Sequence, residues 1–309
     1  MSALGDAVDD YIMVRRTLGS KLDSEARLLA SFVAYVEAVG AKTVTTELAV
    51  AWAKLPGPDA HPSYLGRRLC AVRGFARHLQ AFDPATEVPS AQLLPMQSCR
   101  AVPYLYSEDE ILALMEAASR LTPALRAATY ETLIGLLWAT GMRIGEVVRL
   151  NQADVDWEEG ILTVWHSKFD KSRELPLHPS TLQALTEYAS VRDELCPRAK
   201  EASFFMSTAR RRMVLVTVQS TFTRLVRQVG LKPRSERCRP RVHDLRHTFA
   251  CRVLLGWYQA GVDVEAHLPQ LSTYLGHVDP SSTFWYLTAT PELMALAAQR
   301  RDRARSFGS

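Results

Sequence analysis

Apolar residues in the first third of the chain recur at the spacing of a helix, which predicts a small helical domain. Between residues 28 and 39, Leu, Phe and Val return every three or four positions, and Gly40 is a suitable end for that helix. Two further helices are predicted, one over residues 45–55 and one from about residue 63. The last of these has one aliphatic stripe to bury, and three arginines lie off the stripe as candidate phosphate contacts: Arg67, Arg73 and Arg77.

The hydrophobic period is lost over residues 83–106, where four prolines predict a passage between two domains. We place a helical N-terminal domain at residues 1–96, a linker at 97–106 and a second domain at 107–309. Ser107 starts the S-x-x-E pattern of a capping box directly before an apolar run. The second domain is therefore expected to begin with a helix.

The second domain continues with a buried helix that leads to a polar pair. Residues 133–139 are apolar throughout, and Gly141 interrupts this run. The next helix is predicted to start at Arg143 and to carry Glu146 on the same face.

The hydrophobic period then changes from that of a helix to that of short strands. Three antiparallel strands are predicted between residues 155 and 177, with Lys168 in the turn between the last two. Helices resume at 179–195, at 218–229 and from His243 onward. The predicted fold is therefore mainly α with a small antiparallel β-sheet.

Composition narrows the class of protein further. Apolar residues make up 47% of the chain and charged residues 23%, which is ordinary for a folded protein. No apolar run approaches the roughly 18–20 residues that span a membrane. The first residues have neither a basic region nor an apolar core, so we expect no export signal. Five scattered cysteines favour a reducing, cytoplasmic compartment.

The net charge of +4 is unevenly distributed along the chain. Residues 201–250 hold 11 Lys and Arg against 3 Asp and Glu. Such a segment is either a solvated basic face or a contact surface for a polyanion such as DNA. Four of its arginines are further candidates for DNA contacts: Arg210, Arg211, Arg212 and Arg241.

Residues suited to phosphate chemistry gather in the last third of the chain. R-V-H-D-L-R-H-T-F-A spans residues 241–250, L-G-H spans 275–277 and T-F-W-Y spans 283–286. Arginine forks bind phosphate oxygens, and a phenol with a pKa of about 10 needs such neighbours to react at neutral pH. The pattern predicts phosphoryl transfer with a tyrosine nucleophile, and it is supported upstream by Arg143 and Lys168.

Five segments, each common by itself, occur in one order: A-T-G-M-R-I-G-E, S-K-F-D-K-S-R-E-L-P-L, H-D-L-R-H-T-F-A, Y-L-G-H, and a Tyr nine residues after His277. In this order they resemble the tyrosine recombinases of the phage integrase family, over most of the chain. The resemblance implies a helical core-binding domain and a catalytic domain that clamp DNA. It also implies an integrase or transposase-type enzyme that cleaves and rejoins DNA at specific sites through a 3′-phosphotyrosyl intermediate.

The resemblance gives each matched residue a role. Arg143 and Arg246 would hold the non-bridging oxygens of the scissile phosphate, and His277 would add a further donor. Tyr286 would attack the phosphorus and release a 5′-hydroxyl. Because the arginines supply the positive charge and the phosphotyrosyl bond conserves energy, no metal, ATP or other cofactor is expected.

Three further residues would manage protons and orientation. Lys168 would protonate the leaving 5′-oxygen, with Lys171 as its nearest competitor. His243 would take or relay the tyrosine proton, and Glu146 would orient the arginines and histidines. Phe169 stands where the family commonly has Gly, so the hairpin turn is expected to differ in shape.

Other functions share some of these features. A type IB topoisomerase would use the same chemistry to relax DNA, and a DNA-binding regulator with a silent site would keep the fold. His243 and His247 are spaced like two zinc ligands, but Asp244 replaces the Glu of H-E-x-x-H and no third ligand is evident. His247 is expected to pack in the helix. The segment Leu254–Ser272 is longer than the family's usual link.

The family resemblance also implies partners. They are double-stranded DNA with inverted-repeat core sites, and copies of the same chain as a dimer on one site and a tetramer in synapsis. A tail helix is predicted over residues 290–305, because Thr290 and Pro291 are a capping residue and a favoured first helical residue. A helix so short is marginal alone. We expect it to dock on a neighbouring subunit, with its own domain as the alternative.

Overall fold

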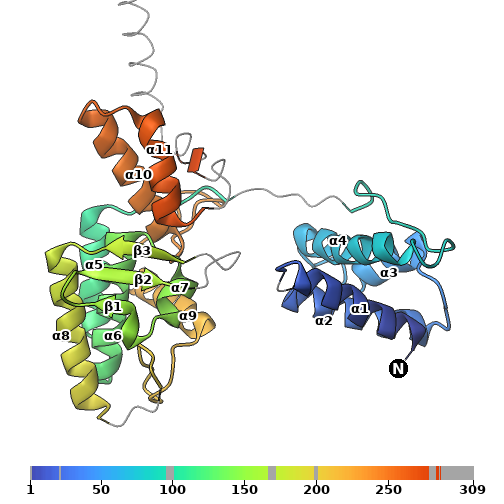
Figure 1. Ribbon diagram of the computed structural model, residues 1–309, viewed down its shortest axis with the longest axis horizontal. Coiled ribbons are helices and arrows are strands. Elements are labelled where there is room, and N and C mark those ends of the chain that lie inside the picture. Colours follow the sequence, from blue (N-terminus) through green and yellow to red (C-terminus); the bar gives the residue numbers. More distant parts are fainter. Residues whose placement is uncertain are drawn as a thin grey trace, which may run out of the picture. The chain divides into compact units, whose positions relative to one another are not determined.

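The computed structural model describes residues 2–20, 22–94, 101–165, 172–197, 201–277, 283, 284 and 286 (Figure 1). The chain divides into two compact units, one up to Arg100 and the other from Ala101. Within the described ranges, no helix is long and apolar enough to cross a membrane.

The first unit is a small bundle of helices around an aromatic core. Phe32, Trp52 and Phe75 are fully buried, and the rings of Phe32 and Trp52 meet edge to face with centroids 5.2 Å apart. Such edge contacts add to the hydrophobic gain of burying large rings. The described helices of this unit are α1 (Ala3–Thr17), α2 (Asp23–Ala38), α3 (Thr46–Lys54) and α4 (Pro62–Leu79).

Helix α1 was not predicted, whereas α2, α3 and α4 were. The Ser2 hydroxyl caps α1 by accepting a hydrogen bond from the backbone N–H of Gly5 at 3.1 Å. The helix buries only Val8, Tyr11 and Ile12 in an otherwise polar sequence. These three buried residues are too few to form a recognisable helical repeat of apolar positions in the sequence.

The second unit is mainly helical and is organised around α6. This helix is apolar on nearly all sides because it packs against α5, α8 and α10. The Ser107 capping box at the start of α5 is confirmed. The described helices of this unit are α5 (Glu108–Ser119), α6 (Ala124–Thr140), α7 (Ile144–Arg149), α8 (Pro179–Leu195), α9 (Leu215–Gln228), α10 (Asp244–Gln259) and α11 (Val264–Leu275).

A three-stranded antiparallel sheet with the order β1-β2-β3 completes this unit, as predicted. Its strands are β1 (Val155–Asp156), β2 (Ile161–Val164) and β3 (Arg173–Pro176). Leu162 of β2 lies opposite Leu175 of β3, and both side chains are fully buried. One face of this small sheet is thereby fixed on the core, which sets the register. The turn that carries Lys168 lies outside the described residues.

A turn at Gly141 connects α6 to α7 and sets the positions of Arg143 and Glu146. Gly141 ends α6 with a φ of 61°, and a Cβ at this position would lie 2.4 Å from the ring of Phe249. Only glycine combines that backbone angle with so close a neighbour. Arg143 follows as the residue before α7, and its N–H donates to the Glu146 carboxylate at 2.9 Å.

The chain between the H-D-L-R-H-T-F-A and Y-L-G-H segments lies in two helices. Helix α10 runs to Gln259, and α11 starts after Asp263, whose carboxylate accepts hydrogen bonds from two N–H groups of its first turn. Leu254, Leu268 and Leu271 pack the two helices into a separate apolar cluster. The segment Leu254–Ser272 therefore belongs to two packed helices, the second of which leads to the site.

Candidate active site

The site is built at the C-terminal end of α11, where helix carbonyls need donors from outside the helix. Three consecutive carbonyls each accept a hydrogen bond from a different arginine: Tyr274 from Nε of Arg173 (2.8 Å), Leu275 from Nη2 of Arg246 (2.6 Å) and Gly276 from Nη2 of Arg143 (2.8 Å). The arginines come from β3, α10 and the start of α7. The negative end of the helix dipole favours such cations. The end of α11 therefore gathers three guanidinium groups that are far apart in the sequence.

One carboxylate, that of Glu146, lies between two of these arginines. Its side chain is 2% exposed and accepts hydrogen bonds from Nη1 of Arg143 at 2.8 Å and from both terminal nitrogens of Arg173 at 2.8 and 3.2 Å. Burial alone would raise the pKa of Glu146, but the hydrogen bonds and charges of Arg173 and Arg143 lower it to about 2. Glu146 is therefore ionised at neutral pH and holds the two guanidinium groups in place.

Arg246 is the most deeply buried of the three arginines, with 2% of the residue exposed. Besides Leu275 it donates to the carbonyl of Gly141 at 2.9 Å, and it lies near enough to the phenol of Tyr286 to act on the pKa of that group. Burial, and then the charge of Arg143, lowers the pKa of Arg246 to about 10. It therefore remains a cation at neutral pH.

His277 lies directly after this helix end and is half-buried. Its Nδ1 is 2.7 Å from the hydroxyl oxygen of Thr283, and its ring is stacked on that of Tyr286 with centroids 5.9 Å apart. Burial, followed by the charges of Arg246 and Arg143, lowers the pKa of His277 to about 4. The imidazole is therefore neutral at pH 7.

Tyr286 is 2% exposed and packs against the apolar cluster of α10 and α11. Burial raises the pKa of its phenol, and the neighbouring Arg246 opposes that effect. His247 lies beside it, with ring centroids 5.4 Å apart. The ring of His247 also meets that of His243 edge to face at 4.9 Å. His247, expected only to pack in its helix, thus lies between two residues that the sequence assigned to catalysis.

His243 is the residue directly before α10, and its side chain is exposed. Partial desolvation and then the charges of Arg246, Arg241 and Arg143 lower its pKa below 6.5, which favours a neutral ring. The next residue, Asp244, is fully buried and forms an ion pair with Arg241 at 2.7 Å. This pair fixes the first turn of α10, from which His243 and Arg246 project.

The structure thus brings together six of the seven residues named for catalysis or its support: Arg143, Glu146, His243, Arg246, His277 and Tyr286. The seventh, Lys168, and the tail at 290–305 lie outside the described residues. Sequence reasoning gave Arg173 no role, although S-K-F-D-K-S-R contains it. With three guanidinium groups, one carboxylate and neutral imidazoles, the described cluster carries an excess of positive charge that suits a phosphodiester.

The arginines proposed from sequence for DNA contacts fall into two groups. Arg73 donates to the carbonyl of Pro89 at 2.9 Å, Arg212 donates to three backbone and side-chain oxygens between Val148 and Asn151, and Arg241 pairs with Asp244. These three guanidinium groups have internal partners that account for their position. Four have exposed side chains: Arg67, Arg77, Arg210 and Arg211.

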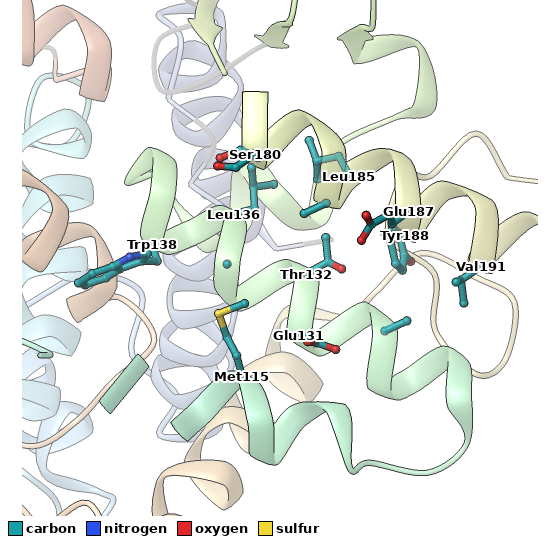
Figure 2. Close-up of a pocket in the computed structure, with 14 residues that line it drawn as sticks. Met115, Glu131, Thr132, Leu136, Trp138, Ser180, Leu185, Glu187, Tyr188 and Val191 are labelled. Atoms are coloured by element: carbon teal, nitrogen blue, oxygen red, sulfur yellow. The ribbon is translucent and has the colours of Figure 1, made fainter. Parts of the chain in front are cut away.

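A separate cavity of about 380 Å³ lies between α5, α6 and α8 and does not coincide with the site (Figure 2). Met115, Thr132 and Leu136 line it from one side and Leu185 and Tyr188 from the other. None of its lining residues belongs to the arginine cluster. Among the residues that the structure describes, no group of three His, Cys, Asp or Glu is placed to hold a metal ion.

Arginine forks, neutral imidazoles and a buried tyrosine on a mainly helical unit define a protein that acts on phosphate esters through a tyrosine. The model of the phage integrase family matches residues 105–292, which hold every described member of this cluster. The chain belongs to the phage integrase family and is a tyrosine recombinase.

Known proteins agree with this assignment over nearly the whole chain. The putative integrase/recombinase y4rB of Sinorhizobium fredii is 44% identical and covers 98% of each chain. The Tn1549 transposon integrase, solved with transposon right-end DNA, has a TM-score of 0.68 at 16% identity over 97% of this chain and 99% of its own. A lambda integrase tetramer bound to a Holliday junction has a TM-score of 0.60 at 20% identity over 90% and 78%. The two structures establish a shared fold.

Proposed function

We propose that this chain is a site-specific DNA recombinase of the integrase or transposase type, with Tyr286 as its nucleophile. One observation carries the proposal. Among the described residues, the phenol of Tyr286 lies near the buried Arg246, and its ring stacks on that of His277, whose neighbours include Arg143. A phosphate held by that arginine pair would lie beside the phenol.

In the proposed reaction the phenolic oxygen of Tyr286 attacks the phosphorus and forms a 3′-phosphotyrosyl bond. The bond from phosphorus to the 5′-oxygen breaks, and the leaving oxygen takes a proton from Lys168. Arg143, Arg246 and His277 stabilise the charge on the non-bridging oxygens. Attack by the 5′-hydroxyl of a partner strand reverses these steps and joins the exchanged strand.

His243 is suited to accept the phenolic proton. Its lowered pKa leaves the imidazole neutral at pH 7, so that it has a lone pair to offer. A residue with exposed surface at the start of α10 is also within reach of solvent, which can carry the proton away.

The burial of Tyr286 adds a conformational step. A phenol that is 2% exposed cannot meet a DNA phosphate unless the surrounding side chains move. Arg143, with 29% of its side chain exposed, and the half-buried His277 are the more accessible phosphate contacts. We therefore place phosphate capture before presentation of the tyrosine.

The fold shared with the Tn1549 and lambda integrases supports DNA as the substrate and assembly of several copies. By that likeness, the chain binds a core site as a dimer and joins two sites as a tetramer. Its place of action is then the compartment that holds the DNA, for which we propose the cytoplasm.

The test is recombination of a supercoiled plasmid that carries two copies of the DNA boundary beside the gene, taken as inverted repeats with a short spacer. A plasmid without these boundaries is the control. We expect excision or inversion only in the first plasmid and without added metal or ATP. Relaxation of both plasmids with no recombinant product would instead support a topoisomerase.

A further inference from the structure

Arg173 has no role in the reaction described above, yet every nitrogen of its guanidinium group is engaged inside the site. Nε donates to the carbonyl of Tyr274 at 2.8 Å, Nη2 to one Glu146 oxygen at 2.8 Å and Nη1 to the other at 3.2 Å. Its side chain is 9% exposed. A two-pronged pair between a guanidinium group and a carboxylate fixes the geometry of both groups more closely than a single contact does.

The backbone beneath the guanidinium is shaped to receive it. Gly276 has a φ of 67°, and a Cβ at this position would lie 2.8 Å from Nη1 and 3.1 Å from Cζ of Arg173. The glycine of the L-G-H segment therefore has two tasks. It ends α11 in the left-handed conformation, and it lets Arg173 lie directly against the chain that leads to His277.

The contacts of Arg173 and Arg143 form a closed set. Both arginines bind the carboxylate of Glu146, and they bind the carbonyls of Tyr274 and Gly276 at the same helix end. Without Arg173, the guanidinium group of Arg143 would keep one contact to the carboxylate and one to the helix end, beside the bond from its own backbone N–H to the carboxylate. Arg173 adds a second connection between the carboxylate and the helix end. Two connections prevent one of these parts from rotating relative to the other, whereas a single connection does not.

We infer that Arg173 is a positioning residue that fixes Arg143 and the backbone before His277 relative to each other, without touching DNA. The inference rests on the proposed function, because it assigns Arg143 and His277 to the scissile phosphate. Arg173 also begins β3, the strand that follows the hairpin of Lys168. Lysine cannot replace it, because an ammonium group lacks the planar fork.

The test compares Arg173→Lys and Arg173→Gln with a control in the same unit. Arg192 is 3% exposed and donates to the carbonyl of Phe204 at 3.1 Å, and its contacts involve none of the site residues. Arg192→Gln therefore reports the effect of losing a buried guanidinium group elsewhere. For each full-length variant, DNA affinity and the single-turnover rate of covalent complex formation are measured on a nicked substrate, at a temperature where every variant is folded.

Both Arg173 variants are expected to bind DNA within about twofold of the wild type and to cleave it roughly 100-fold more slowly, the size of loss that follows a misplacement of about 1 Å. Arg192→Gln should cleave within about threefold of the wild-type rate. Wild-type cleavage by Arg173→Gln, or restoration by Arg173→Lys, overturns the inference. So does a parallel loss of binding and cleavage in the Arg173 and Arg192 variants.

A folding failure has its own control. If Arg173→Gln does not fold, Arg173→Lys takes its place, because lysine keeps a positive charge near the buried carboxylate of Glu146 but has no planar fork. A folded Arg173→Lys variant with slow cleavage and unchanged DNA affinity supports the inference, and one with the wild-type rate overturns it. A wild-type protein that forms no covalent complex would contradict the proposed function itself, whereas unaffected Arg173 variants contradict only this inference.

Discussion

Replacement of Glu146 by glutamine removes the one carboxylate that holds two of the site's arginines. The side chain is 2% exposed, and both of its oxygens accept hydrogen bonds from guanidinium groups. Glutamine has nearly the same shape, but it lacks the charge and presents an NH₂ group to cations. The substitution therefore isolates the electrostatic part of the contact.

The pKa of Glu146 gives the magnitude. Its value falls from 4.5 to about 2 on folding. At about 1.4 kcal/mol for each pH unit, the ionised form contributes on the order of 3 kcal/mol to the free energy of unfolding. Because the folded pKa is the lower one, this stability is fully present above pH 4.5 and is lost as the pH falls toward 2.

Urea unfolding followed by tryptophan fluorescence measures this contribution. Five of the six tryptophans lie after residue 100, so the signal reports mainly the second unit. Glu146→Gln should be less stable than the wild type by about 3 kcal/mol at pH 7. The difference should shrink steadily between pH 4.5 and pH 2.5.

The matched control is Glu116→Gln, which removes an exposed pair with Arg120 on α5. Exposed pairs of this kind contribute about 0.5 kcal/mol or less, so the control should be close to the wild type at every pH. A Glu146→Gln variant as stable as the wild type at pH 7 would refute the reasoning. So would a difference that is the same at pH 7 and pH 3.

Three further outcomes are expected. Lys168→Ala should cleave normal DNA slowly but regain much of its rate on a substrate with a bridging 5′-sulfur, which leaves without a proton; rescue of Lys171→Ala instead would assign the acid to that residue. The Thr283 hydroxyl lies 2.7 Å from Nδ1 of His277 and orients that ring. Thr283→Val should therefore slow cleavage about tenfold with DNA affinity unchanged, whereas Thr283→Ser, which keeps the hydroxyl, should cleave at the wild-type rate. A wild-type rate in the valine variant would exclude this role. A chain ending at Ala289 should bind one half-site but lose cooperative pairing in gel-shift assays, and normal recombination would show that the tail does not couple subunits.

The secondary structure that carries the site was predictable because its signals are local. The Ser107 capping box, the end of α6 at Gly141 and the three short strands each depend on a few neighbouring residues. Helix α1 was missed because its buried stripe is short. Residues 101–106, assigned to the linker, supply two buried tyrosines to the core, which a proline count cannot reveal.

The sequence was enough to predict which residues form the site, but not which of them contact one another. The order of the motifs named Arg143, Arg246, His277 and Tyr286, which the structure brings together. No periodicity could show that three arginines meet the end of α11, since those contacts join residues up to 133 positions apart. Arg173 was overlooked for that reason, and so was the enclosure of Tyr286.

The central claim is that Tyr286 forms the covalent bond to DNA. The most direct measurement incubates the wild type and Tyr286→Phe with a nicked core-site substrate, traps the covalent complex and maps the modified residue by peptide mass spectrometry. We expect the DNA 3′-phosphate on Tyr286 in the wild type, with no covalent complex and unchanged DNA affinity in the Phe variant. A complex that persists in Tyr286→Phe, with the DNA attached to Tyr274 or Tyr258, would contradict the claim.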